Sequence, residues 1–338
     1  ADMQKPYYIC GGLQDNGSVK TWTAANRDNP DLINWTSHGG GYGHWNAIDP
    51  TDDRYYYACS QSSGGGTHSC RRFVDNANGT TTSAAIPQTG FPSNQRYTTH
   101  APLVIDPNNP EVIYIGGATI GRNTNRGVGA FEMISPVMPP GTPNEEDPRL
   151  PGPVPEDEQD TGLYANLYGA VTHLAPAKSK TPVPYAQTIY AGTDTGKVWK
   201  TTDAGATWTQ MQGLPERWVN YIIVDPEDEN HAYVAFSGFR QGDDAAHVYE
   251  TRDGGENWAN ISHNLPNGPV ESIEYNHRTD VLFAATDTGV YVYKDGDTAW
   301  YKISVGMPQV PVLDIKLNAA GTALYAATFG RSVWRLPL

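Results

Sequence analysis

The side chains of this chain that could do acid–base chemistry include carboxylates in short turns and at one strand start. They are Asp15, Asp194, Asp243, Asp287 and Glu271. Hydrolysis of a sugar bond usually needs two carboxyl groups about 5 to 9.5 Å apart. We single out Asp15 and Glu271 as candidate catalytic residues. Asp194 and Asp287 stand in the repeated turn TDTG, where aspartate commonly stabilises the turn itself, so we interpret both as structural.

Arginine, histidine and aromatic residues stand in similar turns and suit the binding of an anionic or polar ligand. The candidate ligand-binding residues are Tyr42, His44, Arg96, His100, Arg122, Arg126, Arg217, Trp218, Arg240 and Arg331. A guanidinium group binds carboxylate or sulfate through two parallel hydrogen bonds and stacks on aromatic rings. This favours a glycan or an acidic protein segment. Two alternatives stay open: the arginines brace neighbouring structural units of the repeat, the blades named below, or His44 or His100 is the base of a polysaccharide lyase.

Several other chemistries lack their motifs. The sequence has no GxSxG elbow, GxxxxGK phosphate loop, Rossmann fingerprint or CxxCH haem attachment, and no histidine pair at HxH or HxxxH spacing. We therefore predict no cofactor and no metal. Lys plus Arg is 23 and Asp plus Glu is 37, so the formal net charge of −14 disfavours nucleic acid as a partner.

An eight-residue repeat indicates the strands and turns that hold these residues. It reads TTDAGATW at 201–208, TRDGGENW at 251–258 and, more weakly, YKDGDTAW at 293–300. The spacing suits one four-stranded unit per repeat. The aspartate accepts backbone hydrogen bonds, the glycine supplies a positive φ and the tryptophan packs inward. We therefore predict a structural role for Asp203, Trp208, Asp253, Trp258, Asp295 and Trp300.

The repeat resembles the Asp-box, or BNR repeat, of sialidase-like and sortilin-like β-propellers. The opening YYICGGLQDNGS and the closing LYAATFGRSVWRL resemble blade signatures of long secreted BNR proteins of the xyloglucanase and sortilin groups. The resemblance implies that turns between second and third strands, and turns entering innermost strands, share one loop-rich face, with Asp-box turns on the other. The candidate residues then fall on the loop-rich face. Sialidase activity is not implied, because the Arg-Ile-Pro segment of sialidases does not occur.

Counting strand-like segments predicts an all-β, seven-bladed β-propeller with four-stranded antiparallel blades. Innermost strands begin near Trp45, Pro102, Val171, Tyr221, Val270 and Val312. The first blade lacks an innermost strand and the last lacks an outer one. We interpret residues 1–338 as one domain with a proline- and acid-rich loop inserted at 136–166. The chain is either complete or a processed part of a longer protein, in which case a missing domain or a partner chain completes the ring.

The three cysteines of the chain indicate whether the protein works in an oxidising compartment. Cys59 and Cys70 flank SQSSGGGTHS between two strand-like runs, which favours a cross-strand disulfide over free thiols. Cys10 is then either a buried thiol or the partner of a cysteine in another chain. No apolar run reaches the length of a membrane span, and the first residues lack a signal-peptide pattern. We expect an extracellular or periplasmic protein whose leader has been removed.

Two functions follow from these expectations. The first is an extracellular propeller that recognises glycan on its loop-rich face and hydrolyses a polysaccharide, as the xyloglucanase-like proteins that it resembles do. The alternative is a non-catalytic module, either sortilin-like in binding peptides or a rigid subunit of a larger complex.

Overall fold

The structure is a computed structural model, and it describes residues 8–13, 16–22, 35–38, 43–61, 67–93, 95–98, 101–138, 169–238 and 242–338. The described residues form strands and turns without a helix. The strands make seven antiparallel sheets, the blades of a β-propeller. Five blades have four strands, and the first and last have three. The predicted fold class and the two incomplete blades are therefore confirmed.

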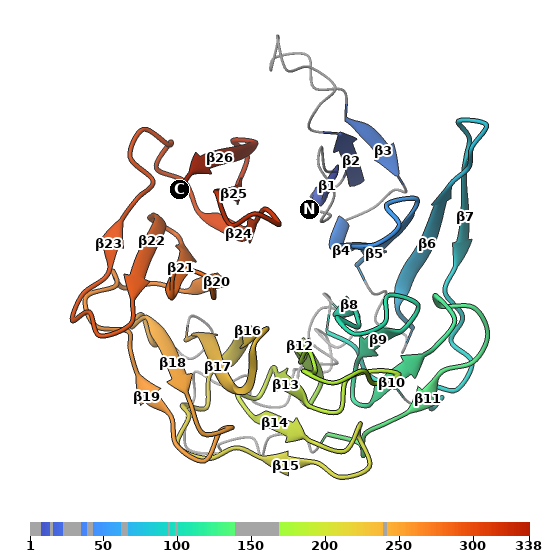
Figure 1. Ribbon diagram of the computed structural model, residues 1–338, viewed down its shortest axis with the longest axis horizontal. Coiled ribbons are helices and arrows are strands. Elements are labelled where there is room, and N and C mark those ends of the chain that lie inside the picture. Colours follow the sequence, from blue (N-terminus) through green and yellow to red (C-terminus); the bar gives the residue numbers. More distant parts are fainter. Residues whose placement is uncertain are drawn as a thin grey trace, which may run out of the picture. The chain divides into compact units, whose positions relative to one another are not determined.

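The strands belong to two compact units, each of which is described by itself. The first unit holds three blades (Figure 1). These are β1 (Tyr8–Leu13), β2 (Gly17–Trp22) and β3 (Thr36–His38); β4 (Gly43–Ile48), β5 (Tyr55–Ser60), β6 (Ser69–Asp75) and β7 (Thr81–Ala85); and β8 (Leu103–Ile105), β9 (Ile113–Gly116), β10 (Ile120–Asn123) and β11 (Glu132–Met133). Most of the predicted inserted loop lies outside the described residues.

The second unit holds four blades. They are β12 (Val171–Pro176), β13 (Ile189–Thr193), β14 (Val198–Thr201) and β15 (Thr209–Gln210); β16 (Trp218–Asp225), β17 (Asp228–Ser237), β18 (His247–Thr251) and β19 (Ala259–Asn260); β20 (Val270–Asn276), β21 (Val281–Thr286), β22 (Gly289–Lys294) and β23 (Tyr301–Lys302); and β24 (Val312–Leu317), β25 (Ala323–Thr328) and β26 (Val333–Pro337). The six predicted innermost strands are β4, β8, β12, β16, β20 and β24.

The core lies between blades, so the second strand of a blade is buried on both faces. Ile113, Tyr114 and Ile115 of β9 are fully buried, as are Ala284 and Ala285 of β21. Burial on both faces explains why these strands read as continuous apolar runs rather than as alternating patterns.

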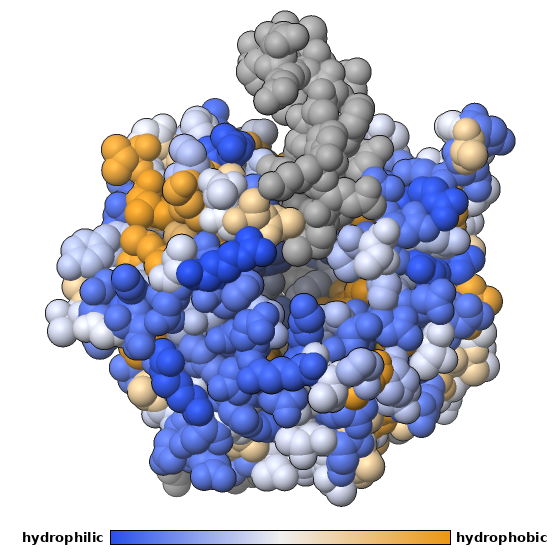
Figure 2. All heavy atoms as spheres, viewed as in Figure 1, coloured by the Kyte–Doolittle hydropathy of each residue, from blue (hydrophilic) through white to orange (hydrophobic). Residues whose placement is uncertain are grey.

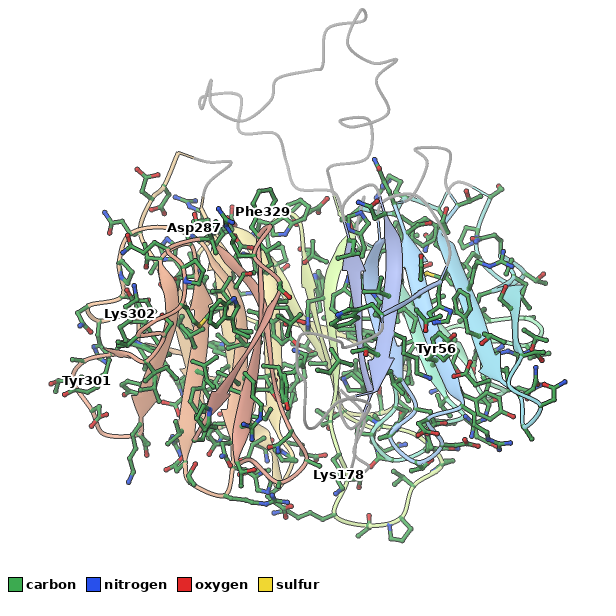
Figure 3. The ribbon with its side chains drawn as sticks, turned by 90° about the horizontal axis from the view of Figure 1, so that it is seen from above. Tyr56, Lys178, Asp287, Tyr301, Lys302 and Phe329 are labelled. Atoms are coloured by element: carbon green, nitrogen blue, oxygen red, sulfur yellow. A yellow bond between two sulfur atoms is a disulfide. The ribbon has the colours of Figure 1, made fainter. Side chains whose placement is uncertain are left out.

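The turns of the second unit lie at two ends. Figure 3 shows Asp287 and Phe329, in turns between second and third strands, at one end, and Lys178, between a first and a second strand, at the other. We call the first the upper end and the second the lower end. Because antiparallel strands alternate in direction, turns from third to fourth strands lie at the lower end. The two strong copies of the repeat are such turns.

In each of the two strong repeat copies, the aspartate accepts hydrogen bonds from residues of its own turn. The Thr207 N–H and hydroxyl donate to the Asp203 carboxylate at 2.8 and 2.6 Å, and the Thr201 hydroxyl donates to it at 2.7 Å. The Thr207 side chain and backbone therefore hold the pKa of Asp203 at about 2. Asp253 is held by Asn257 in the same way. In the weak copy, Asp295 instead forms an ion pair with Arg252 at 3.1 Å.

The predicted disulfide is confirmed. Cys59 and Cys70 are directly opposite in the β5–β6 pair and are joined by a bond, with their Cα atoms 3.9 Å apart. Cys10 is a free thiol that donates to Oδ1 of Asn46 at 3.2 Å.

Candidate functional site

Near the upper end of the second unit, each of three inner strands contains one residue that its partner strand skips. These residues are Asn220 in β16, Glu271 in β20 and Leu313 in β24. Such a bulge breaks the alternation of side chains and redirects the extra one. In the first unit, the register of β4 also shifts, between Gly43 and Asn46, which includes the candidate His44.

Glu271 meets Asn220 and the negative charge of Asp287. Nδ2 of Asn220 donates to Oε2 of Glu271 at 3.4 Å and to the backbone oxygen of Val270 at 3.0 Å. Burial, and then the charge of Asp287, raise the pKa of Glu271 to about 7. Partial removal from water also raises the pKa of Asp287. A carboxylic acid that is still partly protonated at neutral pH, beside a second carboxyl group, is suited to acid–base catalysis.

The turn that holds Asp287 is closed by hydrogen bonds of the preceding threonine. The hydroxyl of Thr286 donates to the oxygen of Gly289 at 3.0 Å and accepts the N–H of Thr288 at 3.2 Å. The equivalent Thr193 likewise binds both the N–H and the oxygen of Lys197. Threonine therefore fixes these TDTG turns. The threonine preceding the aspartate in each TDTG copy was the available signal for this role.

Arg217 also lies at the upper end, directly before β16, and its side chain pairs with the turn between β17 and β18 of the same blade. Its Nε donates to Oδ2 of Asp243 at 3.0 Å, and His247 lies 2.8 Å from the same oxygen. Burial opposes ionisation of Asp243, but the hydrogen bonds from the Ala245 N–H, His247 and Arg217 outweigh it and lower its pKa to about 2. This contact therefore holds the start of β16 to a turn of its own blade, and it does not test the alternative that the arginines brace neighbouring blades.

Two other candidate arginines differ from their predicted placement in loops of the loop-rich face. Arg122 lies inside β10 and forms an ion pair with Glu132 at 2.7 Å. Arg126 follows β10, on the way to the fourth strand, and pairs with Asp49 in the turn between β4 and β5. Its guanidinium lies 4.1 Å from the centre of the Tyr55 ring. Within the first unit, Arg126 therefore lies at the same end as the turn between β4 and β5, because it follows a third strand and not a second.

Arg96 of the first unit is a candidate arginine with buried hydrogen-bond donors that find no partner in the described part of the chain. Nε and one terminal nitrogen are buried without a hydrogen-bond partner among the residues that the structure describes. His68 is also without a partner for either ring nitrogen there, and burial lowers its pKa to about 4. Its ring packs against Tyr97, the residue after Arg96, at 5.5 Å. Buried unpaired donors are uncommon and often indicate a missing ligand or water.

The other predicted site residues are placed as follows. Trp218 begins β16 at the upper end and is half-buried, and Arg331 is exposed in the turn between β25 and β26. Asp15, Tyr42, His100 and Arg240 lie outside the described residues. No group of three potential metal ligands occurs in the described part of the chain. Within that part, no helix is long and apolar enough to cross a membrane.

Comparison with known proteins gives distant relatives. No family model matches the chain. A xyloglucanase of Hypocrea jecorina is 24% identical over an alignment of 249 residues, which covers 67% of this chain and 26% of that protein. The relationship therefore covers a minor part of the relative.

Two solved structures share the fold over almost the whole chain. A GH74 enzyme of Niastella koreensis has a TM-score of 0.67 at 16% identity, covering 99% of this chain and 51% of its own. The GH74 xyloglucanase of Xanthomonas campestris has a TM-score of 0.65 at 16% identity, covering 97% and 50%. This chain thus spans about half the length of these structures. At this identity the likeness shows the fold alone.

Proposed function

We propose that this protein is a glycoside hydrolase that acts on a polysaccharide, with Glu271 and Asp287 as its acid–base pair. The observation that carries the proposal is the bulge at the upper end that redirects Glu271, a buried carboxyl group on which the charge of Asp287 also acts. The distant relationship to a xyloglucanase supports the substrate class, and we propose a xyloglucan-type glycan as the first substrate to test.

The two carboxyl groups have distinct roles in this proposal. Glu271, with a pKa of about 7, donates a proton to the oxygen of the departing sugar. Asp287 is exposed and has the lower ordinary pKa, so it accepts a proton from the attacking water. Asn220 holds Oε2 of Glu271, which leaves Oε1 to carry the proton.

Other parts of the proposal concern recognition and location. For the first unit by itself, we propose that Arg96 binds an anionic or polar group, because its buried Nε and one terminal nitrogen are unpaired among the described residues. We also propose that the repeated turns are Asp-boxes and that the protein acts outside the cytoplasm, where its disulfide is stable. Asp15 stays a predicted catalytic residue.

The test is release of reducing ends from xyloglucan, mixed-linkage glucan and an acidic polysaccharide by the purified chain. Hydrolysis of one of them that falls about 100-fold in Glu271→Gln supports the proposal. Glu256→Gln, an exposed carboxylate away from the pair, is the matched control. Absence of hydrolysis and of glycan binding would contradict it and favour the alternative, a sortilin-like or scaffold module without catalysis. Asp15→Asn belongs in the same assay.

A further inference from the structure

The segment 95–98 of the first unit, which precedes β8, is fixed to the turn between β9 and β10. The side chain of Gln95 donates to the oxygen of Thr119 at 3.0 Å and accepts the N–H and the hydroxyl of Thr119, both at 3.2 Å. The backbone oxygen of Arg96 accepts the N–H of Ala118 at 2.7 Å. The point from which the Arg96 side chain projects is therefore held in place by its own backbone and by its neighbour.

The two sides of this segment carry different side chains. Gln95 and Tyr97 lie on one side, because a Cβ added at Gly117 would meet Nε2 of Gln95 at 2.6 Å and Cδ1 of Tyr97 at 2.8 Å. The polar groups of both side chains are hydrogen-bonded. Side chains two positions apart in an extended segment share one side, which places Arg96 and Thr98 together on the other.

Arg96 and Thr98 have buried polar atoms without a hydrogen-bond partner among the described residues. They are Nε and Nη2 of Arg96 and the hydroxyl oxygen of Thr98. Thr98 is 3% exposed. Nε and Nη2 lie on the same edge of the guanidinium group, and this edge forms two parallel hydrogen bonds to a planar oxyanion. The donors thus match an acceptor with two oxygen atoms.

Another arginine of the same unit shows this edge in use. Nε of Arg54 donates to Oδ1 of Asp52 at 2.8 Å, and Nη2 donates to Oδ2 at 2.6 Å. Arg54 is exposed, and a pair of this kind at the surface stabilises little. A buried guanidinium edge without an anion is costly by comparison. The pairing of Arg54 with a carboxylate is therefore a model for the ligand of Arg96.

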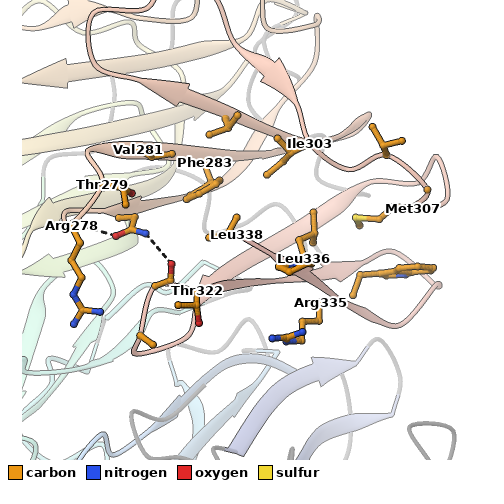
Figure 4. A pocket seen from close by; sticks show the side chains of 18 residues that line it. Arg278, Thr279, Val281, Phe283, Ile303, Met307, Thr322, Arg335, Leu336 and Leu338 are labelled. Carbon is orange, nitrogen blue, oxygen red and sulfur yellow. Dashed lines mark hydrogen bonds between the residues drawn. The ribbon is translucent and has the colours of Figure 1, made fainter.

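The largest described groove of the second unit differs from this site. Its volume is about 1000 Å³, and its lining includes Phe283, Ile303 and Leu336 (Figure 4). Hydrophobic side chains gather over the blades that contain β23 and β26 in the space-filling view (Figure 2). Nη1 of Arg278, in the same lining, donates to the oxygen of Ala319 at 3.0 Å. No described lining residue has a buried polar atom without a partner, so the groove does not indicate a charged ligand.

The charge at Arg96 favours a ligand group with a single negative charge. Arg96 forms no ion pair with any residue in the described ranges. One guanidinium group balances one negative charge, and the formal net charge of −14 repels a dianion more strongly than a monoanion. A carboxylate has one charge and two oxygen atoms in one plane, as Asp52 presents to Arg54.

We propose that Arg96 and Thr98 form a binding site for the carboxylate of a small acidic ligand. Nε and Nη2 of Arg96 donate to its two oxygen atoms, and the Thr98 hydroxyl donates to one of them. In a protein proposed to act on glycans, the ligand of this class is a uronic-acid sugar. The site rests on the anion binding proposed for Arg96 and does not depend on hydrolysis by Glu271 and Asp287.

The test is an NMR titration of the whole chain with D-glucuronate, with D-glucose as the neutral probe of the same ring. We expect one glucuronate to bind per chain with a Kd in the millimolar range and glucose to bind at least about tenfold more weakly. Inorganic sulfate that binds as tightly as glucuronate would contradict a carboxylate site. Absence of glucuronate binding would overturn the site and leave the proposed hydrolysis untouched, because no hydrolysis is measured.

Variants locate the binding site. Arg96→Lys should weaken glucuronate binding about tenfold, because an ammonium group cannot supply two parallel donors. Arg71→Lys, at an exposed arginine of the same unit, is the matched control and should keep the natural Kd. Unchanged binding by Arg96→Lys would overturn the proposal.

Thr98→Val tests the hydroxyl. It should weaken glucuronate binding about threefold. It should also leave the melting temperature of the free protein unchanged or raise it, because the buried hydroxyl has no partner in the described part of the chain. A lower melting temperature would show that the hydroxyl is paired within the chain and would contradict its role in the site.

The chain's own acidic residues are the other source of a carboxylate. The test is one variant with Glu156→Gln, Asp157→Asn, Glu158→Gln and Asp160→Asn, which should bind glucuronate with the natural Kd. Tighter binding by this variant, lost again when Arg96→Lys is added, would show that an internal carboxylate occupies the Arg96 edge. That result would overturn the proposal.

Discussion

Nδ2 of Asn220 lies 3.4 Å from Oε2 of Glu271, and both residues are the extra residues of bulges in neighbouring inner strands. The same Nδ2 donates to the oxygen of Val270 at 3.0 Å, so one bulge holds the backbone of the other. This contact positions a carboxyl group that would otherwise follow the alternation of β20. The chemistry proposed for the upper end depends on it.

Replacing Glu271 by Gln should reduce kcat about 100-fold, because the amide cannot donate the proton that the carboxylic acid supplies. With the natural protein, activity should fall as pH rises through about 7, where Glu271 loses its proton. Initial rates between pH 5 and 9 measure both effects. A variant that keeps the natural rate and the natural alkaline limb would remove Glu271 from the mechanism.

Replacing Asp287 by Asn should lower the pKa of Glu271. The negative charge of Asp287 stabilises the protonated form of Glu271, so its removal favours ionisation at a lower pH. A carbon-detected NMR titration of the Glu271 carboxyl group measures the shift without substrate. Asp295→Asn, at a distant ion pair, should leave the pKa of Glu271 unchanged. An unchanged pKa in Asp287→Asn would show that the two groups do not interact.

Replacing Asp253 by Ala should lower the denaturant midpoint of unfolding and leave hydrolysis unaffected. The carboxylate accepts the Asn257 N–H and amide and the Thr251 hydroxyl within its own turn. Denaturant unfolding measures the loss, and the natural kcat is the control. A large fall in kcat in a folded variant would give this turn a role that its hydrogen bonds do not suggest.

His231 should make stability depend on pH. It lies 3.0 Å from both Asp225 and Glu250; burial opposes its protonation, but hydrogen bonds to Glu250 and Asp225 outweigh this and raise its pKa above 6.5. This stabilisation is fully present below about pH 6.5 and is lost as pH rises through the folded value. The pKa of Glu250 is lowered from 4.5, so its contribution is lost as pH falls through its folded value.

The melting temperature should therefore be highest between about pH 4.5 and 6.5, as far as these two groups decide it. His231→Gln should flatten the decline above pH 6.5. His231→Ala should cost about 3 kcal/mol, because it removes the ion-pair partner of the buried Asp225 and leaves Glu250 with Arg252 alone. Scanning calorimetry across this range gives the comparison. A decline above pH 6.5 that persists in His231→Gln would assign it to other groups.

The blades, the repeated turns within them and the Cys59–Cys70 disulfide follow from short-range patterns in the sequence. Repeated turns, alternating strands and the Cys59–Cys70 spacing are short-range patterns, and each depends on residues close in the chain. The sequence therefore predicted seven blades, the incomplete first and last ones and the disulfide. The sequence also selected Glu271, as one of two candidate catalytic residues.

Which candidate side chains are paired with other residues, and which can bind a ligand or react, follows from the tertiary structure alone. The bulge at Glu271 depends on how β20 pairs with β21, and the ion pairs of Arg126 and Arg217 depend on residues 77 and 26 positions away. Asp287 differs from a structural aspartate because Thr286 makes the turn bonds. That Arg96 lacks a partner among the described residues is visible only once each of them has a place. These strand and ion-pair partners are far apart in the chain, so no local pattern of the sequence predicts them.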